Sequence, residues 1–171
     1  MAYELIDIVN EHDEVIGNIE RTPAWDKNTA NVFRVVAALI WRTDGRLLVQ
    51  RRALHKSAPL KFDASFGGMA TTGLTPDQAA AKELQEELGL TQPLALLAKI
   101  KSYREDASLR AFIYLYTLQH DGPYTNWEDE AERLEFFTPE EMDHMTARFP
   151  YMFTQGMLEI WQFYRQMQKG T

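Results

Sequence analysis

Hydrophobic and polar residues alternate along much of the first third of the chain, and this alternation predicts paired strands. Residues 4–21, ELIDIVNEHDEVIGNIER, predict two short strands joined by a polar turn at Asn10 to Asp13, an N-terminal hairpin. Residues 31–42 are rich in β-branched and aromatic side chains and end at the turn signal Thr43-Asp44-Gly45. Because RLLVQRR follows, residues 32–52 predict a second hairpin.

A second region of strands lies downstream. Residues 94–105 and 108–120 alternate well enough to form a pair of strands. Residues 53–73 carry a Gly-Gly pair and predict a loop with at most one short strand. The segment 126–135, NWEDEAERLE, is strongly acidic, and we interpret it as a solvated loop or as a source of carboxylates for a site.

One helix is predicted between these regions, in TPDQAAAKELQEELGL (75–90). Thr75 is a good N-cap, a proline follows it, and Gln78 completes a capping box. Gly89 can end the helix in a left-handed conformation. A buried stripe at helical spacing is formed by Ala80, Leu84 and Leu88.

Two more helices are predicted near the C-terminus. TPEEM (138–142) is a capped helix start, and residues 150–168 are aromatic and amphipathic. Strands on both sides of a central helix, with helices at the end, indicate an α/β or α+β sandwich on a mixed sheet. A length of 171 residues without repeats or linkers suits a single domain, residues 1–171.

Composition narrows the range of functions. The formal net charge is −7, which disfavours nucleic acid as a partner because its binding depends on neutralising phosphates. The sequence has no apolar run of membrane-spanning length and no signal-peptide pattern at its start, so we expect no membrane partner and a cytoplasmic location. Cysteine is absent, which excludes disulfides and thiolate chemistry.

Three carboxylates stand out on the predicted helix. Glu83, Glu86 and Glu87 have spacings of i, i+3 and i+4, which place them on one face although like charges there repel. Such a face either stays in water or holds a cation. A carbonyl from the preceding glycine segment, which we assign to Gly67, would add a further hard oxygen, and Mg²⁺ or Mn²⁺ prefers such ligands.

The segment GGMATTGLTPDQAAAKELQEELGL resembles the Nudix box, whose pattern is G, five residues, E, seven residues, R-E-U-x-E-E-x-G-U, where U is a bulky aliphatic residue. Gly68 matches the first glycine, and residues 83–90 match the end of the pattern. Leu74 and Lys82 depart from it, since the family has Glu and Arg there. These changes either leave a metal site whose carboxylates are less firmly oriented, here called a slack site, or mark a metal site that is rebuilt around Leu74.

Outside the box, the sequence resembles the Nudix branch that includes isopentenyl-diphosphate isomerase and its hydrolase-like relatives. That resemblance implies that Arg52 and Lys56 contact substrate phosphate. The isomerase needs a cysteine immediately before the box glycine, where this chain has Gly67, and a metal-binding histidine where it has Met69. Isomerase activity is therefore the weaker alternative.

The resemblance implies an α/β/α sandwich and a Mg²⁺- or Mn²⁺-dependent pyrophosphohydrolase that cleaves a small nucleoside-diphosphate-type substrate. Glu83, Glu86 and Glu87 would act with Glu130 in catalysis. A binding protein that has lost catalysis is a second alternative. A homodimer through the N-terminal hairpin or the C-terminal helix stays open, and substrate selection would depend on loops around aromatic residues, namely Phe62, Tyr103 and Phe112.

Overall fold

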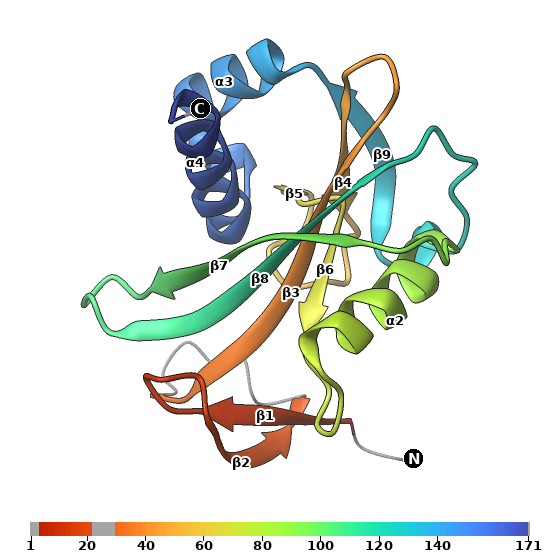
Figure 1. The fold of residues 1–171 in the computed structure, drawn as a ribbon. Coiled ribbons are helices and arrows are strands. Elements are labelled where there is room, and N and C mark those ends of the chain that lie inside the picture. The colour runs from red at the N-terminus through yellow and green to blue at the C-terminus, as the bar shows by residue number, and fades with distance from the viewer. Residues whose placement is uncertain (1–3, 22–29, 171) are drawn as a thin grey trace.

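Strand β3 (Val32–Trp41) is the axis of the sheet in the computed structural model, which describes residues 4–21 and 30–170. One edge of β3 pairs in parallel with β8 (Leu109–Gln119), in register from Phe33 opposite Ala111 to Trp41 opposite Gln119. Figure 1 shows these two long strands crossing the middle of the molecule side by side. The parallel pair fixes the sheet as mixed, as the sequence predicts.

The other edge of β3 is shared by three antiparallel neighbours along its length. These are β1 (Leu5–Val9), β6 (Phe66–Met69) and β4 (Leu47–Arg52). The remaining described strands extend the sheet: β2 (Val15–Glu20) pairs with β1, β5 (Phe62–Asp63) and β9 (Ala131–Phe137) pair with β4, and β7 (Ala95–Tyr103) pairs with β8.

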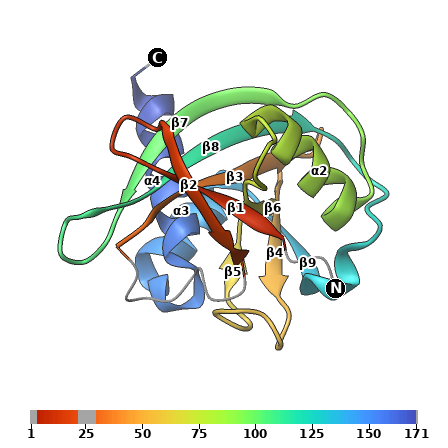
Figure 2. The same cartoon turned by 90° about the horizontal axis from the view of Figure 1, so that it is seen from below.

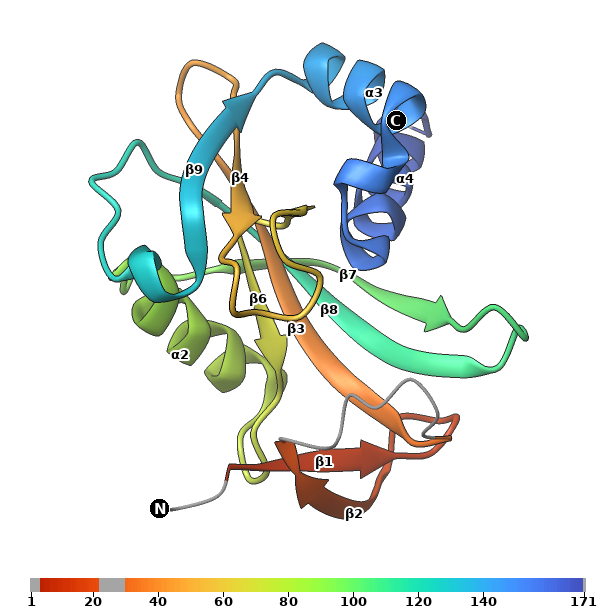
Figure 3. The same ribbon diagram turned by 180° about the vertical axis from the view of Figure 1, so that it is seen from behind.

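Helices cover both faces of this sheet. Helix α2 (Pro76–Leu88) lies on one face, and α3 (Pro139–Arg148) and α4 (Gln155–Lys169) lie on the other, as Figures 1 and 3 show from opposite sides. Two single 3-10 turns are also present, η1 (Trp127–Asp129) and η2 (Pro150–Met152). The arrangement is an α/β/α sandwich, which confirms the expected fold class. No helix in the described ranges is long and apolar enough to cross a bilayer.

The two large hydrophobic cores follow from the period-two pattern of β3, whose successive side chains point to opposite faces, and a small third cluster joins Ile6 of β1 to Phe33. One core faces α3 and α4 and includes Ala37, Leu39, Leu47, Val49, Met157, Ile160 and Trp161. The other faces α2 and includes Val36, Ala38, Ile40, Leu48, Ala80, Leu84 and Leu88. Because both faces are buried, β3 reads as an almost continuous apolar run.

The caps of α2 form as the sequence predicts. The Thr75 side chain accepts a hydrogen bond from the Gln78 backbone N–H, and the Gln78 side chain accepts one from the Thr75 N–H. Gly89 ends the helix at φ +66°, and its N–H donates to the Gln85 carbonyl. Because both ends are fixed, the glutamates of this helix are held at defined positions relative to the sheet.

The predicted hairpin over residues 32–52 is wrong in most of its length. Strands β3 and β4 pair only where Trp41 lies opposite Leu47. Beyond that point β6 occupies the edge of β3, and β4 pairs with β9 and β5 instead. The turn at Thr43-Asp44-Gly45 does form, with the Gly45 N–H donating to the Arg42 carbonyl at 3.0 Å, but pairing with segments distant in sequence separates the two strands beyond it.

Three further boundaries differ from the sequence prediction. The Gly67-Gly68 pair lies in strand β6 and not in a loop. Part of the acidic segment forms β9, whose alternating residues pair with β4. Helix α4 begins at Gln155, after the η2 turn and the N-cap Thr154, and not at residue 150. Secondary-structure propensity alone does not show which strand will pair with a segment of glycines or glutamates. It also does not show which residue is the N-cap of α4.

The N-terminal hairpin is confirmed as β1 and β2 (Figure 2). A buried carboxylate in its turn ties it to the sheet. Asp13, at φ +63°, accepts a 2.7 Å bond from Arg34 Nε and further bonds from Lys99 and Tyr114. Burial by itself would raise the pKa of Asp13, but the bonds from Lys99, Tyr114 and Arg34 outweigh it and lower the pKa. The hairpin is therefore fixed to three strands at once.

We expect Asp13→Asn to destabilise the protein by about 2–3 kcal/mol at neutral pH, because cationic partners lose their acceptor. Since the folded-state pKa is lowered, this stabilisation is present above the unfolded-state pKa and is lost as the pH falls through the folded one. Thermal melts of wild type and Asp13→Asn should therefore converge as the pH is lowered, with the exposed neighbour Glu11→Gln as control. If the difference in melting temperature between the two proteins did not change with pH, the charge of Asp13 would have no role in this stabilisation.

Candidate active site on helix α2

Two of the three glutamates point into the protein. Glu83 and Glu87 are each only 5% exposed and lie beside Leu84 and Leu88 on the buried side of α2. The side chain of Glu86 is 56% exposed and forms an ion pair with Lys82, one turn away, at 3.3 Å. The face predicted as one cluster is thus divided into two buried carboxylates and one at the surface.

The two buried carboxyl groups interact with each other. Burial raises the pKa of Glu83, and burial together with the charge of Glu83 raises the pKa of Glu87 well above its usual value. A hydrogen bond between them favours the protonated form of Glu87. Two carboxylates that repel each other in a buried environment either share a proton or bind a cation.

Gln50 on β4 is the polar partner of this pair. Its Nε2 donates a 3.0 Å hydrogen bond to Glu87 Oε2, and its side chain is 4% exposed. The position follows from the strand period, because Leu48 packs in the core facing α2 and Gln50 lies two residues further on the same face. Sequence reasoning missed Gln50, since a single polar residue in a strand carries no signal of its own.

Gly68 provides the space for the Glu83 carboxylate. A Cβ placed on Gly68 would lie 2.6 Å from Cδ of Glu83 and 2.7 and 2.8 Å from its two oxygens. Only glycine allows the backbone of β6 to approach the carboxylate this closely. The backbone of β6, which includes the carbonyl of Gly67, therefore runs directly beside the Glu83 carboxylate.

Glu130 and Lys56 meet near this pair. Lys56 Nζ binds Glu130 Oε1 at 2.5 Å, and the charge of Glu130 contributes to the raised pKa of Glu87. Glu130 follows η1 and precedes β9, so the strand that the sequence analysis missed is what brings it to the helix. The structure thus joins Glu130 to the glutamates of α2 and gives Lys56 a carboxylate partner.

A cavity of about 480 Å³ opens next to Gly68, between the sheet and the start of α4. Cationic side chains at its wall are Arg21, Arg52, Lys61 and Arg110, whereas the floor includes the aliphatic residues Val35, Ala37, Ile113 and Ile160. Gly68 lines this cavity while also touching Glu83. A molecule in the cavity would therefore have cations around it and the carboxylate pair behind β6.

Arg52 reaches this cavity because the register of β4 against β9 shifts between Arg51 and Arg52. Its guanidinium is already engaged: it donates to the Ser57 carbonyl at 2.7 Å and pairs with Asp63 at 2.9 Å. Lys56 is not among the lining residues of the cavity. Of the two predicted phosphate contacts, the geometry therefore places only Arg52 at the wall.

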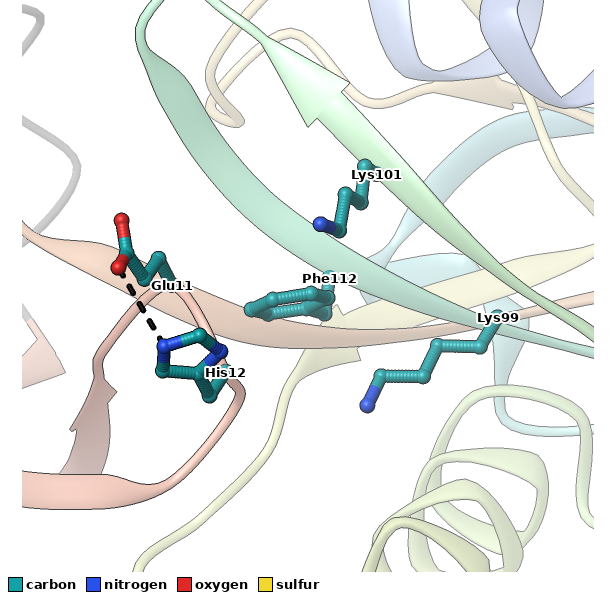
Figure 4. A pocket seen from close by; sticks show the side chains of 5 residues that line it. All are labelled: Glu11, His12, Lys99, Lys101 and Phe112. Carbon is teal, nitrogen blue, oxygen red and sulfur yellow. Dashed lines mark ion pairs between the residues drawn. The ribbon is translucent and has the colours of Figure 1, made fainter.

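The three aromatic residues predicted to shape the substrate loops lie elsewhere. Phe62 is buried against Phe137, at a ring distance of 5.5 Å, and Tyr103 is an exposed residue at the end of β7. Phe112 lies under Lys99 and Lys101 in a separate pocket of about 300 Å³ beside the hairpin turn, which Glu11 and His12 complete (Figure 4). None of the residues predicted for catalysis, metal binding or phosphate binding lines that pocket.

The donor set on α2 fits a divalent cation in its chemistry, although not yet in its arrangement. Within residues 4–21 and 30–170, no three His, Asp or Glu side chains are arranged as they stand to hold a metal ion. The buried pair Glu83 and Glu87, with Glu86 one turn away, offers hard anionic oxygens around one end of β6. Rotation of the exposed Glu86 side chain would be needed to complete three carboxylates.

Known proteins share both the sequence and the fold. Residues 32–155 match the NUDIX domain family. The chain is 34% identical over 155 residues to a Nudix hydrolase of Deinococcus radiodurans, a match that covers 85% of this chain and 83% of that protein. It is 35% identical over 149 residues to the uncharacterized Nudix hydrolase YfcD of Escherichia coli, covering 85% and 78%.

Solved structures agree with this assignment. The crystal structure of DR0079 from Deinococcus radiodurans has a TM-score of 0.78 at 28% identity and covers 95% of this chain and 98% of its own. An Ap4A hydrolase of C. elegans, at 14% identity and a TM-score of 0.57, shares the fold over 81% of this chain and 100% of its own. The finer resemblance to the isomerase branch stays a prediction. With the box residues of α2 packed against Gly68 of β6, the chain belongs to the Nudix hydrolase family.

Proposed function

We propose that this protein is a Mg²⁺- or Mn²⁺-dependent pyrophosphohydrolase that cleaves the phosphoanhydride bond of a small nucleoside-diphosphate-type substrate. One observation carries the proposal: Glu83 and Glu87 are buried side by side on α2, and Gly68, which touches the Glu83 carboxylate, also lines a cavity with four cationic side chains at its wall. The cavity has a volume typical of small-molecule sites. The nucleoside part of the proposal rests on the resemblance to the family.

Three glutamates of α2, Glu83, Glu86 and Glu87, would hold the metal ion together with the Gly67 carbonyl. A bound Mg²⁺ neutralises charge on phosphate oxygens and makes a coordinated water more acidic. The protein's own part is to orient the carboxylates. Gln50 does so for Glu87 by donating to its Oε2, a bond that opposes the rise in the pKa of Glu87 without cancelling it.

The cations at the cavity wall would receive the substrate phosphates. Arg21 and Lys61 line the cavity, and Arg52 holds Ser57 and Asp63 so that the β4–β5 connection keeps its shape. Charge-assisted hydrogen bonds from such groups would stabilise the transferring phosphoryl group. A substrate phosphate would replace Asp63 as one of the hydrogen-bond partners of the Arg52 guanidinium, as we expect for a residue that binds phosphate directly.

Glu130 is proposed as the general base that takes the proton from the attacking water. It lies within electrostatic range of Glu87, and Lys56 fixes its carboxylate at 2.5 Å. Lys56 would then act on catalysis through Glu130, and this replaces its expected direct contact with phosphate.

The alternatives are weaker on these observations. An isomerase of the related branch would need a thiol at position 67, and the sequence has no cysteine. A binding protein without catalysis would have no reason to keep two repelling carboxylates buried beside each other. A panel of nucleoside diphosphates, triphosphates, sugar nucleotides and dinucleotides, assayed with Mg²⁺ for product release, tests the proposal. Absence of hydrolysis across the panel would overturn it.

The first prediction for the active site concerns Gly68. A methyl group there must displace the Glu83 carboxylate, so Gly68→Ala should weaken Mg²⁺ affinity about 10-fold or more and lower kcat. The matched control is Gly17→Ala in β2, where an added Cβ meets nothing within 4 Å. Isothermal titration with Mn²⁺ and initial rates measure both effects. Equal metal affinity in the two variants would place the metal elsewhere.

The second prediction concerns Glu87. Glu87→Gln keeps the size of the side chain but removes an anionic oxygen, and we expect kcat to fall about 10²-fold, near 3 kcal/mol of barrier. The fold should persist, because Gln50 can still hydrogen-bond to the new amide. The exposed Glu105→Gln serves as control. If Glu87→Gln turns over substrate at the wild-type rate in saturating Mg²⁺, the proposed role is wrong.

The third prediction uses two adjacent arginines of β4. Arg52→Ala should raise KM more than it lowers kcat, because it removes a cation from the cavity wall. Arg51 binds the Leu60 carbonyl and Glu132 and does not line the cavity, so Arg51→Ala should leave KM unchanged. Steady-state kinetics on the best substrate of the panel compares the two. The same KM in both variants would contradict a phosphate role for Arg52.

A further inference from the structure

We propose that Glu4 is a positioning residue for the carboxylates of α2: it holds Lys82 and Arg21 so that Glu83 and Glu86 stay available to a divalent cation. The inference rests on the proposed function, since it concerns the same site. Glu4 lies just before β1 and is 78 positions away from Lys82 in the sequence. No sequence motif connects it to the helix.

Both oxygens of Glu4 are occupied. Oε1 accepts hydrogen bonds from Thr71 Oγ1 at 2.7 Å and from Lys82 Nζ at 3.0 Å, and Oε2 accepts one from Arg21 Nη1 at 2.6 Å. Burial by itself would raise the pKa of Glu4, but the bonds from Thr71, Arg21 and Lys82 outweigh it and lower the pKa to about 2. The carboxylate is therefore charged at neutral pH.

The two cations bound by Glu4 also act on the helix. Lys82 Nζ lies 3.3 Å from Glu86 Oε2, and the charges of Lys82 and Arg21 both oppose the rise in the pKa of Glu83. Without Glu4, both cations would lose their hydrogen-bonded acid, and the nearest remaining acids among the described residues would be Glu83 and Glu86 for Lys82, and Glu83 and Glu130 for Arg21. They would then compete with a metal ion for Glu83 and Glu86. With Glu4 present, each cation is shared between two acids.

This arrangement accounts for the two departures from the box pattern. Leu74 packs against the core that contains Ala80 and Leu84, so it is part of the hydrophobic layer under the helix. Lys82 takes its carboxylate partner from the N-terminal hairpin. The structure therefore favours a site rebuilt around Leu74 over a slack one, with Glu4 as the acid that orients the basic residue.

The backbone fixes the hairpin here independently of the Glu4 side chain. The Thr72 N–H donates to the Leu5 carbonyl at 2.8 Å, and Ile6 forms a bridge with Thr71. Figure 1 shows β1 lying beside the connection from β6 to α2. A substitution at Glu4 should therefore change the charge network and leave the strand in place.

The test measures Mn²⁺ affinity of the full-length protein without substrate, by isothermal titration or by the loss of free Mn²⁺ signal in electron paramagnetic resonance. Glu4→Gln should weaken Mn²⁺ binding about 10-fold. Glu4→Asp keeps the charge but is too short to reach both cations, so it should also weaken binding. Wild-type affinity in either variant would overturn the proposal, provided that circular dichroism shows both variants folded.

A double-mutant cycle with Lys82→Met separates positioning from the simple loss of a negative charge. If Glu4 acts through Lys82, the effect of Glu4→Gln should shrink to about 3-fold or less when Lys82 is absent. A through-space effect of the charge would be the same in both backgrounds, and that result would overturn the proposal. Asp13→Asn, at the other end of the same hairpin, is the control and should leave Mn²⁺ affinity unchanged.

The outcome for Glu4 can be distinguished from that for the proposed function. If the wild type binds Mn²⁺ but hydrolyses none of the substrate panel, the proposed function fails and the Mn²⁺ cycle still decides the role of Glu4. If the wild type binds no Mn²⁺, both fail. Hydrolysis by the wild type with additive Mn²⁺ affinities in the cycle would support the function and overturn the positioning role.

Discussion

The site depends on one constraint, the burial of two carboxyl groups side by side and away from solvent. Glu83 and Glu87 repel each other, and burial removes the water that would screen them. The surrounding structure is built to tolerate this: α2 is capped at both ends, Gln50 donates to one carboxylate, and Gly68 leaves room for the other. The core under the helix supplies the stability that offsets the repulsion. Charge put there at a cost to stability is typical of a functional site.

How much of this could be read from the sequence depends on how local the interaction is. The hairpin of β1 and β2, the capped helices and the carboxylate spacing come from neighbours within a few residues, and they were predictable. Gln50, Arg21 and Glu4 reach the site through pairing between distant segments, and no pattern of residue types encodes that. The missed strand β9 has the same origin, because an acidic segment becomes a strand only when β4 offers an edge. The family resemblance supplied the fold and the box, but not the partner of Lys82.

The site also differs from its box pattern in where its supporting groups come from. A pattern of consecutive residues implies that one segment carries the metal ligands and the groups that orient them. Here Leu74 packs against the core, and the acid nearest Lys82 is Glu4, which lies just before β1. The β6–α2 connection is the meeting point, since Thr71 contacts Glu4 and Thr72 contacts Leu5. The box pattern is therefore incomplete in the sequence, at Leu74 and Lys82, whereas in the folded chain Lys82 has a carboxylate partner in Glu4.

The parallel pairing of β3 with β8 has a consequence for how the chain folds. Phe33 lies opposite Ala111, so the central pair of strands must close a loop of more than seventy residues before either gains its partner. High contact order of this kind slows folding, and during synthesis β3 must wait for β8 to emerge from the ribosome. Until then, the most apolar strand of the protein lacks its parallel neighbour, while the β1–β2 hairpin can form early from local contacts. Strand β3, the axis of the finished sheet, is thus also the strand that can most readily associate with other chains during synthesis.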